Sequence, residues 1–302
     1  MKNKSINPSY QIDATLRVFA PEEQTTPTIF SSPHSGRHYI KPFTDLSPLS
    51  KTSLRQSEDA FVDEIFSNAP LFGASLLVAL FPRAFVDPNR KAWELDPKMF
   101  SDVLPPNVIT RSPYIRAGLG TIPRVVADGK QIYREKLRFS DAKTRIIDFY
   151  IPYHKTLKEL ITKTFNRFNC CLLIDCHSMP SNSGRGEIAT PDIILGDNNG
   201  QSCSSEIVEL VEKACLNEGF TVARNNPYSG GFTTQNYGRP ETGIHTLQIE
   251  VNRAIYMNEE TIKRLPSINS LKSKISNIIE TVTQIQSSIM RPNTNKKLDA
   301  AE

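Results

Sequence analysis

Short apolar segments alternate along the chain with longer segments in which apolar residues recur every three or four positions. Four short segments have the length and aliphatic content of β-strands, and they cover residues 28–32, 75–81, 170–176 and 246–251. Their nearly continuous hydrophobicity is typical of strands that are buried on both faces of a sheet. We therefore expect a central sheet whose two faces are both covered.

The longer segments between these strands have the period of amphipathic helices. Four such stripes are Phe61, Val62, Ile65 and Phe66; Leu157, Leu160, Ile161, Thr164, Phe165 and Phe168; Ile207, Val208, Leu210 and Val211; and Leu271, Ile275, Ile278, Ile279, Val282 and Ile285. Alternation of strands and helices predicts a three-layer α/β sandwich with a mixed, mainly parallel sheet covered by helices on both faces. In such sheets, chemistry gathers where the strands end.

The chain of 302 residues is long enough to bury a substantial core, and we expect a single domain over residues 26–290. Residues 1–25 are mostly polar and predict a flexible N-terminal segment, and residues 291–302 predict a disordered C-terminal tail. Residues 102–129 contain several Pro and Gly and no regular pattern. Loops of that length are usually lids or walls of a site.

Composition narrows the classes of partner. The formal net charge is +4, and Lys and Arg are scattered rather than gathered in a run, so we expect no nucleic-acid partner and leave room for a small anionic substrate. The five cysteines follow no disulfide or zinc-ribbon spacing and indicate buried thiols in a reducing compartment. Without a signal-peptide pattern or a membrane-spanning segment, the sequence predicts a cytoplasmic protein with no membrane partner. It leaves the oligomeric state open.

Two clusters near the N-terminus carry candidate chemistry, each with a structural alternative. A short apolar strand ends at Pro33 and leads His34 into a turn that contains Gly36, which suits either a metal ligand or a turn histidine bound to backbone. Glu58 and Asp59 follow Ser57 ahead of a helical stripe. Taken alone, that pattern is ordinary helix capping.

Two later strands place polar residues on one face. Asp175 and His177 stand two residues apart at the end of an apolar strand and therefore share a face, where both need partners. In the segment 246–252, Gln248 and Glu250 alternate with Leu and Ile, so one face is core and the other polar. Glu250 is the candidate catalytic group there, whereas His245 falls on the apolar side and is interpreted as structural.

In order along the chain, the phrases SSPHSGRHY, RQSEDAFVDEIF, FPRAFVDPNR, LLIDCHSMP, PDIILGD, NNPYSGGFTTQNYGRP and HTLQIEVNRAIYM resemble the N-formylglutamate amidohydrolase family. The resemblance runs from about residue 29 to residue 256. That family is related to zinc carboxypeptidases and aspartoacylase-like deacylases, so the resemblance implies a zinc carboxypeptidase-like fold.

The resemblance also implies roles for the candidate residues. His34 and His177 would be the two imidazole ligands of one zinc ion, and the carboxylate ligand would come from Glu58 or Asp59, with Asp59 favoured. Carboxypeptidases have an acidic residue three positions after the first histidine, but this chain has Arg37 there. Glu250 would be the general base that accepts a proton from water activated by the metal.

Cationic clamps are implied for the free carboxylates of an acylated amino acid. Asn89 and Arg90 resemble the Asn-Arg pair that carboxypeptidases use on a substrate carboxylate, and Arg90 also belongs to the catalytic set. Arg185, Arg239 and Arg253 are further candidates for substrate binding. For each arginine, the structural alternative is a surface charge or an ion pair.

The resemblance implies zinc-dependent hydrolysis of the amide of N-formyl-L-glutamate to formate and glutamate. Two alternatives stay open at this point. The same centre could act on another N-acyl amino acid or on a small peptide-like amide, or the chain could be a non-catalytic, ligand-binding relative.

Overall fold

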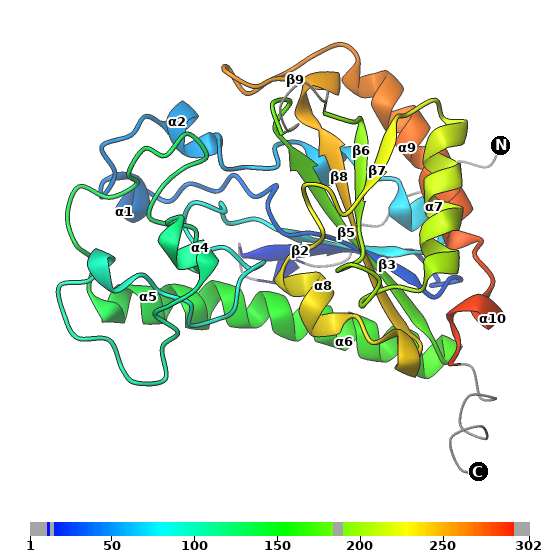
Figure 1. Cartoon of the computed structure of the whole chain (residues 1–302), viewed down its shortest axis with the longest axis horizontal. Coiled ribbons are helices and arrows are strands. Elements are labelled where there is room, and N and C mark those ends of the chain that lie inside the picture. Colours follow the sequence, from blue (N-terminus) through cyan, green and yellow to red (C-terminus); the bar gives the residue numbers. More distant parts are fainter. Residues whose placement is uncertain (1–10, 13–14, 184–189, 293–302) are drawn as a thin grey trace.

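A twisted sheet runs through the middle of the computed structural model, which describes residues 11–12, 15–183 and 190–292 (Figure 1). Along the sheet the strand order is β1-β2-β4-β3-β5-β8-β6-β7. The strands are β1 (Gln11–Ile12), β2 (Leu16–Phe19), β3 (Thr28–Ser32), β4 (Ser75–Ala79), β5 (Cys171–Met179), β6 (Ile193–Gly196), β7 (Val222–Arg224) and β8 (Ile244–Asn252). A separate two-stranded ribbon joins β9 (Met257–Asn258) and β10 (Lys263–Arg264).

The centre of the sheet is parallel and its flanks are mixed. The strands β4, β3, β5 and β8 pair in parallel, so their carboxyl ends meet at one edge. On the outer sides, β2 pairs antiparallel with β4, β6 pairs antiparallel with β8, and β7 continues in parallel with β6. The sequence-based prediction of a mixed, mainly parallel sheet is therefore confirmed.

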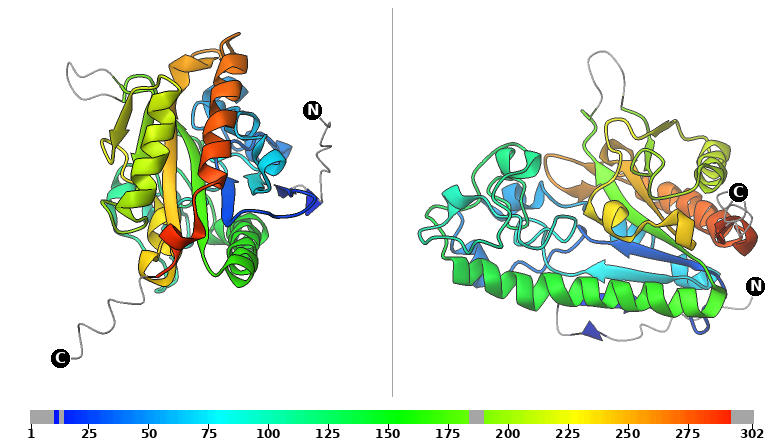
Figure 2. Two further views of the ribbon diagram at one scale, coloured as in Figure 1. Left: turned by 90° about the vertical axis from the view of Figure 1, so that its right-hand side faces the viewer. Right: turned by 60° about the horizontal axis from the view of Figure 1, so that its bottom comes forward.

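Helices cover both faces of this sheet. Against one face lies the long α6 (Ile151–Phe168), reached from α5 (Phe139–Arg145) through the π-helical turn η3 (Ile146–Tyr150); α7 (Ser205–Asn217) and α9 (Ile268–Thr283) lie on the other side of the sheet (Figure 2). Two buried clusters result. Leu172 and Ile174 of β5 pack with α7 and α9, whereas Leu173 packs with α6. This strict alternation produces the predicted three-layer sandwich.

Shorter elements connect these layers. They are α1 (Lys41–Thr44), α2 (Lys51–Arg55), α3 (Val62–Ile65), α4 (Pro113–Arg116), α8 (Phe232–Tyr237), α10 (Ser287–Met290) and the 3₁₀ turns Ala69–Phe72, Pro97–Met99, Pro240–Thr242 and Arg253–Ile255. Most of the stretch 102–129 is irregular, as the sequence predicts. None of the helices described has the length and apolar content that a membrane span requires.

The four strands and the four helical stripes expected from the pattern are present, although the first stripe forms only the four-residue α3. The expectation of a flexible segment over residues 1–25 does not hold for Leu16–Phe19, because β2 completes the antiparallel flank and buries Leu16 and Val18. The strand β6, in the phrase PDIILGD, was not predicted. Within the expected C-terminal tail, residues 293–302 lie outside the described part of the chain.

Candidate metal centre and active site

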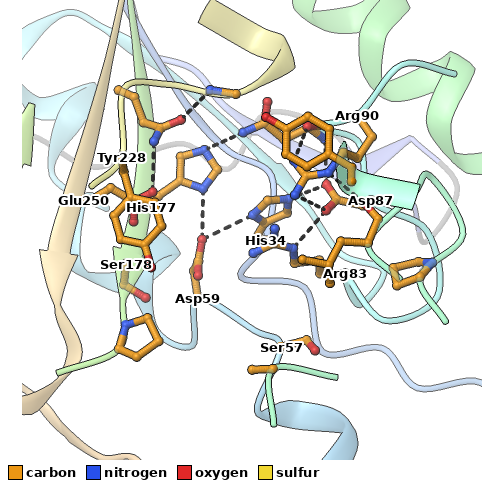
Figure 3. Close-up of a pocket in the computed structure, with 18 of the residues that line it drawn as sticks. His34, Ser57, Asp59, Arg83, Asp87, Arg90, His177, Ser178, Tyr228 and Glu250 are labelled. Carbon is orange, nitrogen blue, oxygen red and sulfur yellow. Dashed lines mark hydrogen bonds and ion pairs between the residues drawn. The ribbon is translucent and has the colours of Figure 1, made fainter. Parts of the chain in front are cut away.

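His34, His177 and Glu250 lie together at the carboxyl edge of the parallel strands, with Asp59 beside the two histidines (Figure 3). His34 follows the end of β3 by two residues, and His177 stands near the end of β5. The parallel register places Glu250 of β8 beside His177. Parallel pairing thus brings together side chains that lie far apart in the sequence, at the edge where α/β sheets bind their ligands.

His34, Asp59 and His177 form a group whose donor atoms all lie within 4.8 Å of one another. The Nδ1 atom of His34 lies 3.3 Å from Asp59 Oδ2, and the Nδ1 atom of His177 lies 2.9 Å from the same oxygen. All three side chains are buried. Two imidazole nitrogens and one carboxylate oxygen that converge on a common point are a donor set that fits a divalent metal such as zinc.

A second carboxylate stands behind each imidazole. His34 Nε2 lies 2.7 Å from Asp87 Oδ1, and His177 Nε2 lies 2.8 Å from Asp175 Oδ2. Asp175 is held in turn by the hydroxyl of Ser31 at 2.7 Å. A carboxylate on Nε2 keeps the proton on that nitrogen, so the lone pair of Nδ1 faces the site. Such carboxylate–histidine pairs orient the ligands of metal centres.

The electrostatics of this group favour a cation. Burial alone lowers the pKa of His177, but Asp175, Asp59 and Glu250 outweigh burial and raise that pKa well above its usual range. Burial raises the pKa of Asp59, yet the hydrogen bonds of His177 and His34 hold it well below normal. The Asp59 carboxylate is therefore ionised, and the surrounding negative charge suits a cation at the imidazoles.

The two adjacent acids proposed for the third ligand point in different directions. Asp59 faces the imidazoles with Oδ2 while its Oδ1 accepts a hydrogen bond of 2.9 Å from Arg253 Nη2. The Glu58 carboxylate accepts hydrogen bonds from the Tyr39 hydroxyl at 2.7 Å and from Arg55 Nε at 3.1 Å. The structure thus brings Asp59, and not Glu58, to His34 and His177.

Glu250 is buried, and among the residues that the structure describes only one of its two oxygens accepts a hydrogen bond. Its Oε1 accepts a hydrogen bond of 2.9 Å from Gln248 Nε2, and the Gln248 Oε1 accepts one of 3.1 Å from the backbone N–H of Gly231. Because a backbone N–H can only donate, it determines which end of the Gln248 amide faces Glu250. Burial first, and then the charge of Asp59, raises the pKa of Glu250 to about 7, a value suited to a general base.

Two arginines flank the centre on the loop that follows β4. Arg83 donates from Nε to Asp87 Oδ2 at 2.9 Å and lines the cavity that also holds His34, Asp59 and His177. Arg90 donates from Nε to the Leu119 carbonyl at 2.8 Å and from Nη1 to the Asn89 carbonyl at 2.7 Å. Burial raises the pKa of Asp87, but the two arginines and the His34 imidazole more than offset it and hold that pKa well below its usual range.

Asn89 uses its amide within the protein. Its Oδ1 accepts hydrogen bonds from the backbone N–H of Thr233 at 2.8 Å and from the Thr233 hydroxyl at 3.1 Å, at the start of α8. A Cβ at Gly231 would stand 2.3 Å from Asn89 Nδ2, so this approach requires glycine. Through these contacts Asn89 holds residues 230–233 close to His34, Asp59 and His177.

These groups line one cavity of about 480 Å³, which the irregular loops 114–127 and 227–231 enclose. Among the arginines expected to bind substrate, Arg90 and Arg253 line this cavity. Arg253 is largely engaged, because it donates to Ser178 Oγ at 3.1 Å, to the Gln56 carbonyl at 3.3 Å and to Asp59. The Arg239 guanidinium instead donates to the backbone carbonyls of Gln235 and Gly238, outside the cavity. Arg185 lies outside the described residues.

Sequence reasoning missed Arg83, Asp87 and the contacts of Gln248. Arg83 and Asp87 belong to the phrase FPRAFVDPNR, where two charged residues interrupt apolar ones directly after a buried strand. That interruption is a usable signal, since buried charges need partners. The interpretation of His245 as structural agrees with its contacts, because its ring binds the Met290 carbonyl at 2.9 Å and accepts from the Ser204 N–H at 3.2 Å.

The chain matches one family model and several known proteins. The family model described as N-formylglutamate amidohydrolase matches residues 26–257. The chain is 30% identical over 242 residues to N-formylglutamate deformylase of Pseudomonas aeruginosa, which covers 78% of this chain and 83% of that protein. It is 27% identical over 249 residues to the deformylase of Pseudomonas putida, covering 80% of this chain and 86% of that one. The crystal structure of N-formylglutamate amidohydrolase from Ralstonia eutropha JMP134 superposes with a TM-score of 0.85 at 32% identity, over 90% of this chain and 98% of that one. The chain therefore belongs to the N-formylglutamate amidohydrolase family.

Proposed function

We propose that this protein hydrolyses the amide bond of N-formyl-L-glutamate and releases formate and L-glutamate. The observation that carries the proposal is the convergence of His34, Asp59 and His177 beside a buried acid, Glu250, whose pKa is raised to about 7. The identity of the substrate is inferred from the names of the Pseudomonas and Ralstonia relatives.

We further propose that the group holds one divalent ion, with zinc as the preferred identity. The ligands would be Nδ1 of His34, Nδ1 of His177 and Oδ2 of Asp59, each already oriented by a partner on its far side. When bound, such an ion supplies Lewis acidity toward water and toward a substrate carbonyl. Arg253 would keep Asp59 turned toward the ion by occupying its other oxygen.

Glu250 is proposed as the group that moves the proton. Gln248 occupies Oε1, so Oε2 is the oxygen that accepts a proton from the attacking water and returns it to the leaving amine of glutamate. A pKa of about 7 suits both halves of that exchange, because neither the protonated nor the ionised form is strongly disfavoured near neutral pH.

In this proposal Arg83 and Arg90 bind different negative groups of the substrate. Within the described residues Arg83 is hydrogen-bonded through Nε only, and its remaining donors suit the oxygen on which negative charge develops. Arg90 lies further along the same wall and suits a free carboxylate of the glutamyl group. The sequence also predicts Arg90 as a carboxylate clamp, and its side chain lines this cavity.

The experiment is a substrate panel with purified, zinc-loaded protein. Formate release from N-formyl-L-glutamate should be fastest, and N-acetyl-L-glutamate and N-formyl-L-alanine should each be much slower, the first for its acyl group and the second for its missing carboxylate. In the same assay, His177→Ala should lose formate release. His38→Ala is its matched control, because His38 is exposed. Equal rates on all three amides would support a broader acyl-amino-acid hydrolase, and no turnover by metal-loaded protein would overturn the assignment.

Cysteine chemistry bears on the compartment. All five cysteines are buried thiols without disulfide partners, and burial raises the pKa of Cys176 well above normal. Thiols in that state suit a reducing environment, which supports our proposal of a cytoplasmic protein.

A further inference from the structure

A compact turn at residues 112–119 stands over the clamp arginine. Ser112 begins the short helix α4 by accepting a hydrogen bond of 3.0 Å from the Ile115 N–H. Gly118, with φ of +78°, ends the turn, and the N–H of Leu119 returns to the Tyr114 carbonyl at 2.8 Å. The side chain of Ile115 is buried and anchors the turn. The turn thereby presents two groups on one side, the ring of Tyr114 and the carbonyl of Leu119.

Both groups contact Arg90. The Cζ atom of Arg90 lies 4.0 Å from the centroid of the Tyr114 ring, and its Nε donates to the Leu119 carbonyl at 2.8 Å. Nη1 donates to the Asn89 carbonyl, while Nη2 stands 4.0 Å from Asp87 Oδ2, beyond hydrogen-bond distance. One face and one edge of the guanidinium are thus occupied. Within the part of the chain that the structure describes, the Nη2 edge makes no hydrogen bond.

Backbone contacts fasten the turn to the loop that carries the arginine. The N–H of Asp87 donates to the Thr121 carbonyl at 2.8 Å, and the N–H of Thr121 donates to the Glu94 carbonyl at 2.8 Å. The hydroxyl of Thr121 also donates to the Lys91 carbonyl. Residues on both sides of Arg90 therefore bind the segment next to Tyr114, and the contact between ring and guanidinium belongs to a braced structure.

We propose that Tyr114 is a positioning and specificity-determining residue for carboxylate recognition. This proposal rests on the proposed function, in which Arg90 binds a free carboxylate of the substrate. An aromatic ring stacked on one face of a guanidinium holds its plane and leaves binding to the in-plane N–H groups, which match the two oxygens of a carboxylate. Tyr114 would thus raise affinity for substrates with that carboxylate and leave the chemical step unchanged.

The first experiment separates binding from chemistry. Tyr114→Ala should raise KM for N-formyl-L-glutamate about 2- to 30-fold, the range that one cation–π contact supports, with kcat unchanged. Tyr114→Phe keeps the ring and should restore affinity. Val103→Ala, on the same irregular stretch at 95% exposure, is the matched control for a loop substitution. A loss confined to kcat, or a Phe variant as impaired as the Ala variant, would overturn the proposal.

The second experiment tests whether Tyr114 acts through Arg90. The dissociation constant of zinc-loaded protein for L-glutamate is measured by calorimetry in a double-mutant cycle of Tyr114→Ala and Arg90→Lys, since a lysine ammonium lacks the planar face. Tyr114→Ala should cost little further affinity in the Arg90→Lys background. An equal loss in both backgrounds would mean direct contact with the ligand and would refute the positioning role. This readout needs no turnover, so failure of the proposed hydrolysis and failure of the Tyr114 proposal are told apart.

Discussion

His154 of α6 contacts both the loop that carries Arg90 and the helix α8, and its burial predicts a specific pH dependence of stability. Its Nε2 donates to the Pro88 carbonyl at 2.8 Å, and its Nδ1 accepts from the Tyr237 hydroxyl at 2.8 Å. Burial lowers the pKa of His154 to about 4. The neutral ring is thus the form that the folded state holds.

The magnitude follows from linkage. An unperturbed histidine has a pKa of about 6.5, so the unfolded chain takes up this proton at a higher pH than the folded protein does. Above pH 6.5 both states are neutral at this position and the ring imposes no cost. As the pH falls from about 6.5 toward about 4, the unfolded state gains the proton first, and the free energy of unfolding decreases by about 3 kcal/mol on account of His154.

The assay compares wild-type protein with His154→Gln by urea unfolding at steps from pH 7 to pH 4. Excess chelator is present so that protons linked to metal binding do not contribute. At pH 7 the variant should be less stable by about 1–3 kcal/mol, because hydrogen bonds are lost. That gap should close by about 3 kcal/mol at pH 4. Burial also lowers the pKa of His245, which is present in both proteins and cancels in the difference.

Ile161→Val is the matched control, since Ile161 is buried on the same helix and does not titrate. Its loss of about 0.5–1.5 kcal/mol should be the same at every pH. If the gap between wild type and His154→Gln stays constant from pH 7 to pH 4, the folded protein takes up this proton at the same pH as the unfolded chain, and the reasoning fails.

Three further predictions concern the centre itself. Glu250→Gln should lower kcat by about 10²–10⁴ while zinc content and melting temperature stay near wild type, and initial rates within a few fold of wild type would remove Glu250 as the base. Arg90→Ala should weaken substrate binding by about 2–5 kcal/mol, seen in KM, and unchanged kinetics would take Arg90 out of the site. His177→Ala should abolish stoichiometric zinc, measured by elemental analysis after dialysis, and wild-type metal affinity would contradict the ligand assignment.

Local patterns were sufficient for the elements at the centre of the fold. Burial on both faces gives β5 its apolar run from Cys171 to Ile174, and the alternation of polar and apolar residues gives β8 one core face. A single buried face gives α6, α7 and α9 their helical period. The strands β2 and β6 have four residues each, and they are strands because β4 and β8 offer them unpaired edges. A four-residue segment carries too little pattern to reveal a pairing that depends on distant chain.

Some residues of the candidate site could likewise be predicted from local patterns, whereas others depend on contacts between distant parts of the chain. The sequence pattern predicted His177 and Glu250, because alternation along a strand places polar residues together on the face opposite the core. The contact of Arg253 with Asp59 joins residues 194 positions apart, and no local signal distinguishes such an arginine from a substrate clamp. Likewise, only the path of the chain after His34 decides that Asp59 turns toward the imidazoles while its neighbour Glu58 turns toward Tyr39.

The order of the strands determines when His34, Asp59 and His177 can come together during synthesis of the chain. The strands β3, β5 and β8 are neighbours in the sheet but far apart in the sequence. Residues 33–170 separate β3 from β5, and residues 180–243 separate β5 from β8. A nascent chain that has emerged as far as Asp59 holds two of the three proposed ligands, and the third arrives only with β5. An ion bound there would connect the first fifth of the protein to its middle, and its binding free energy would add to the stability of the whole sheet rather than of one hairpin or helix.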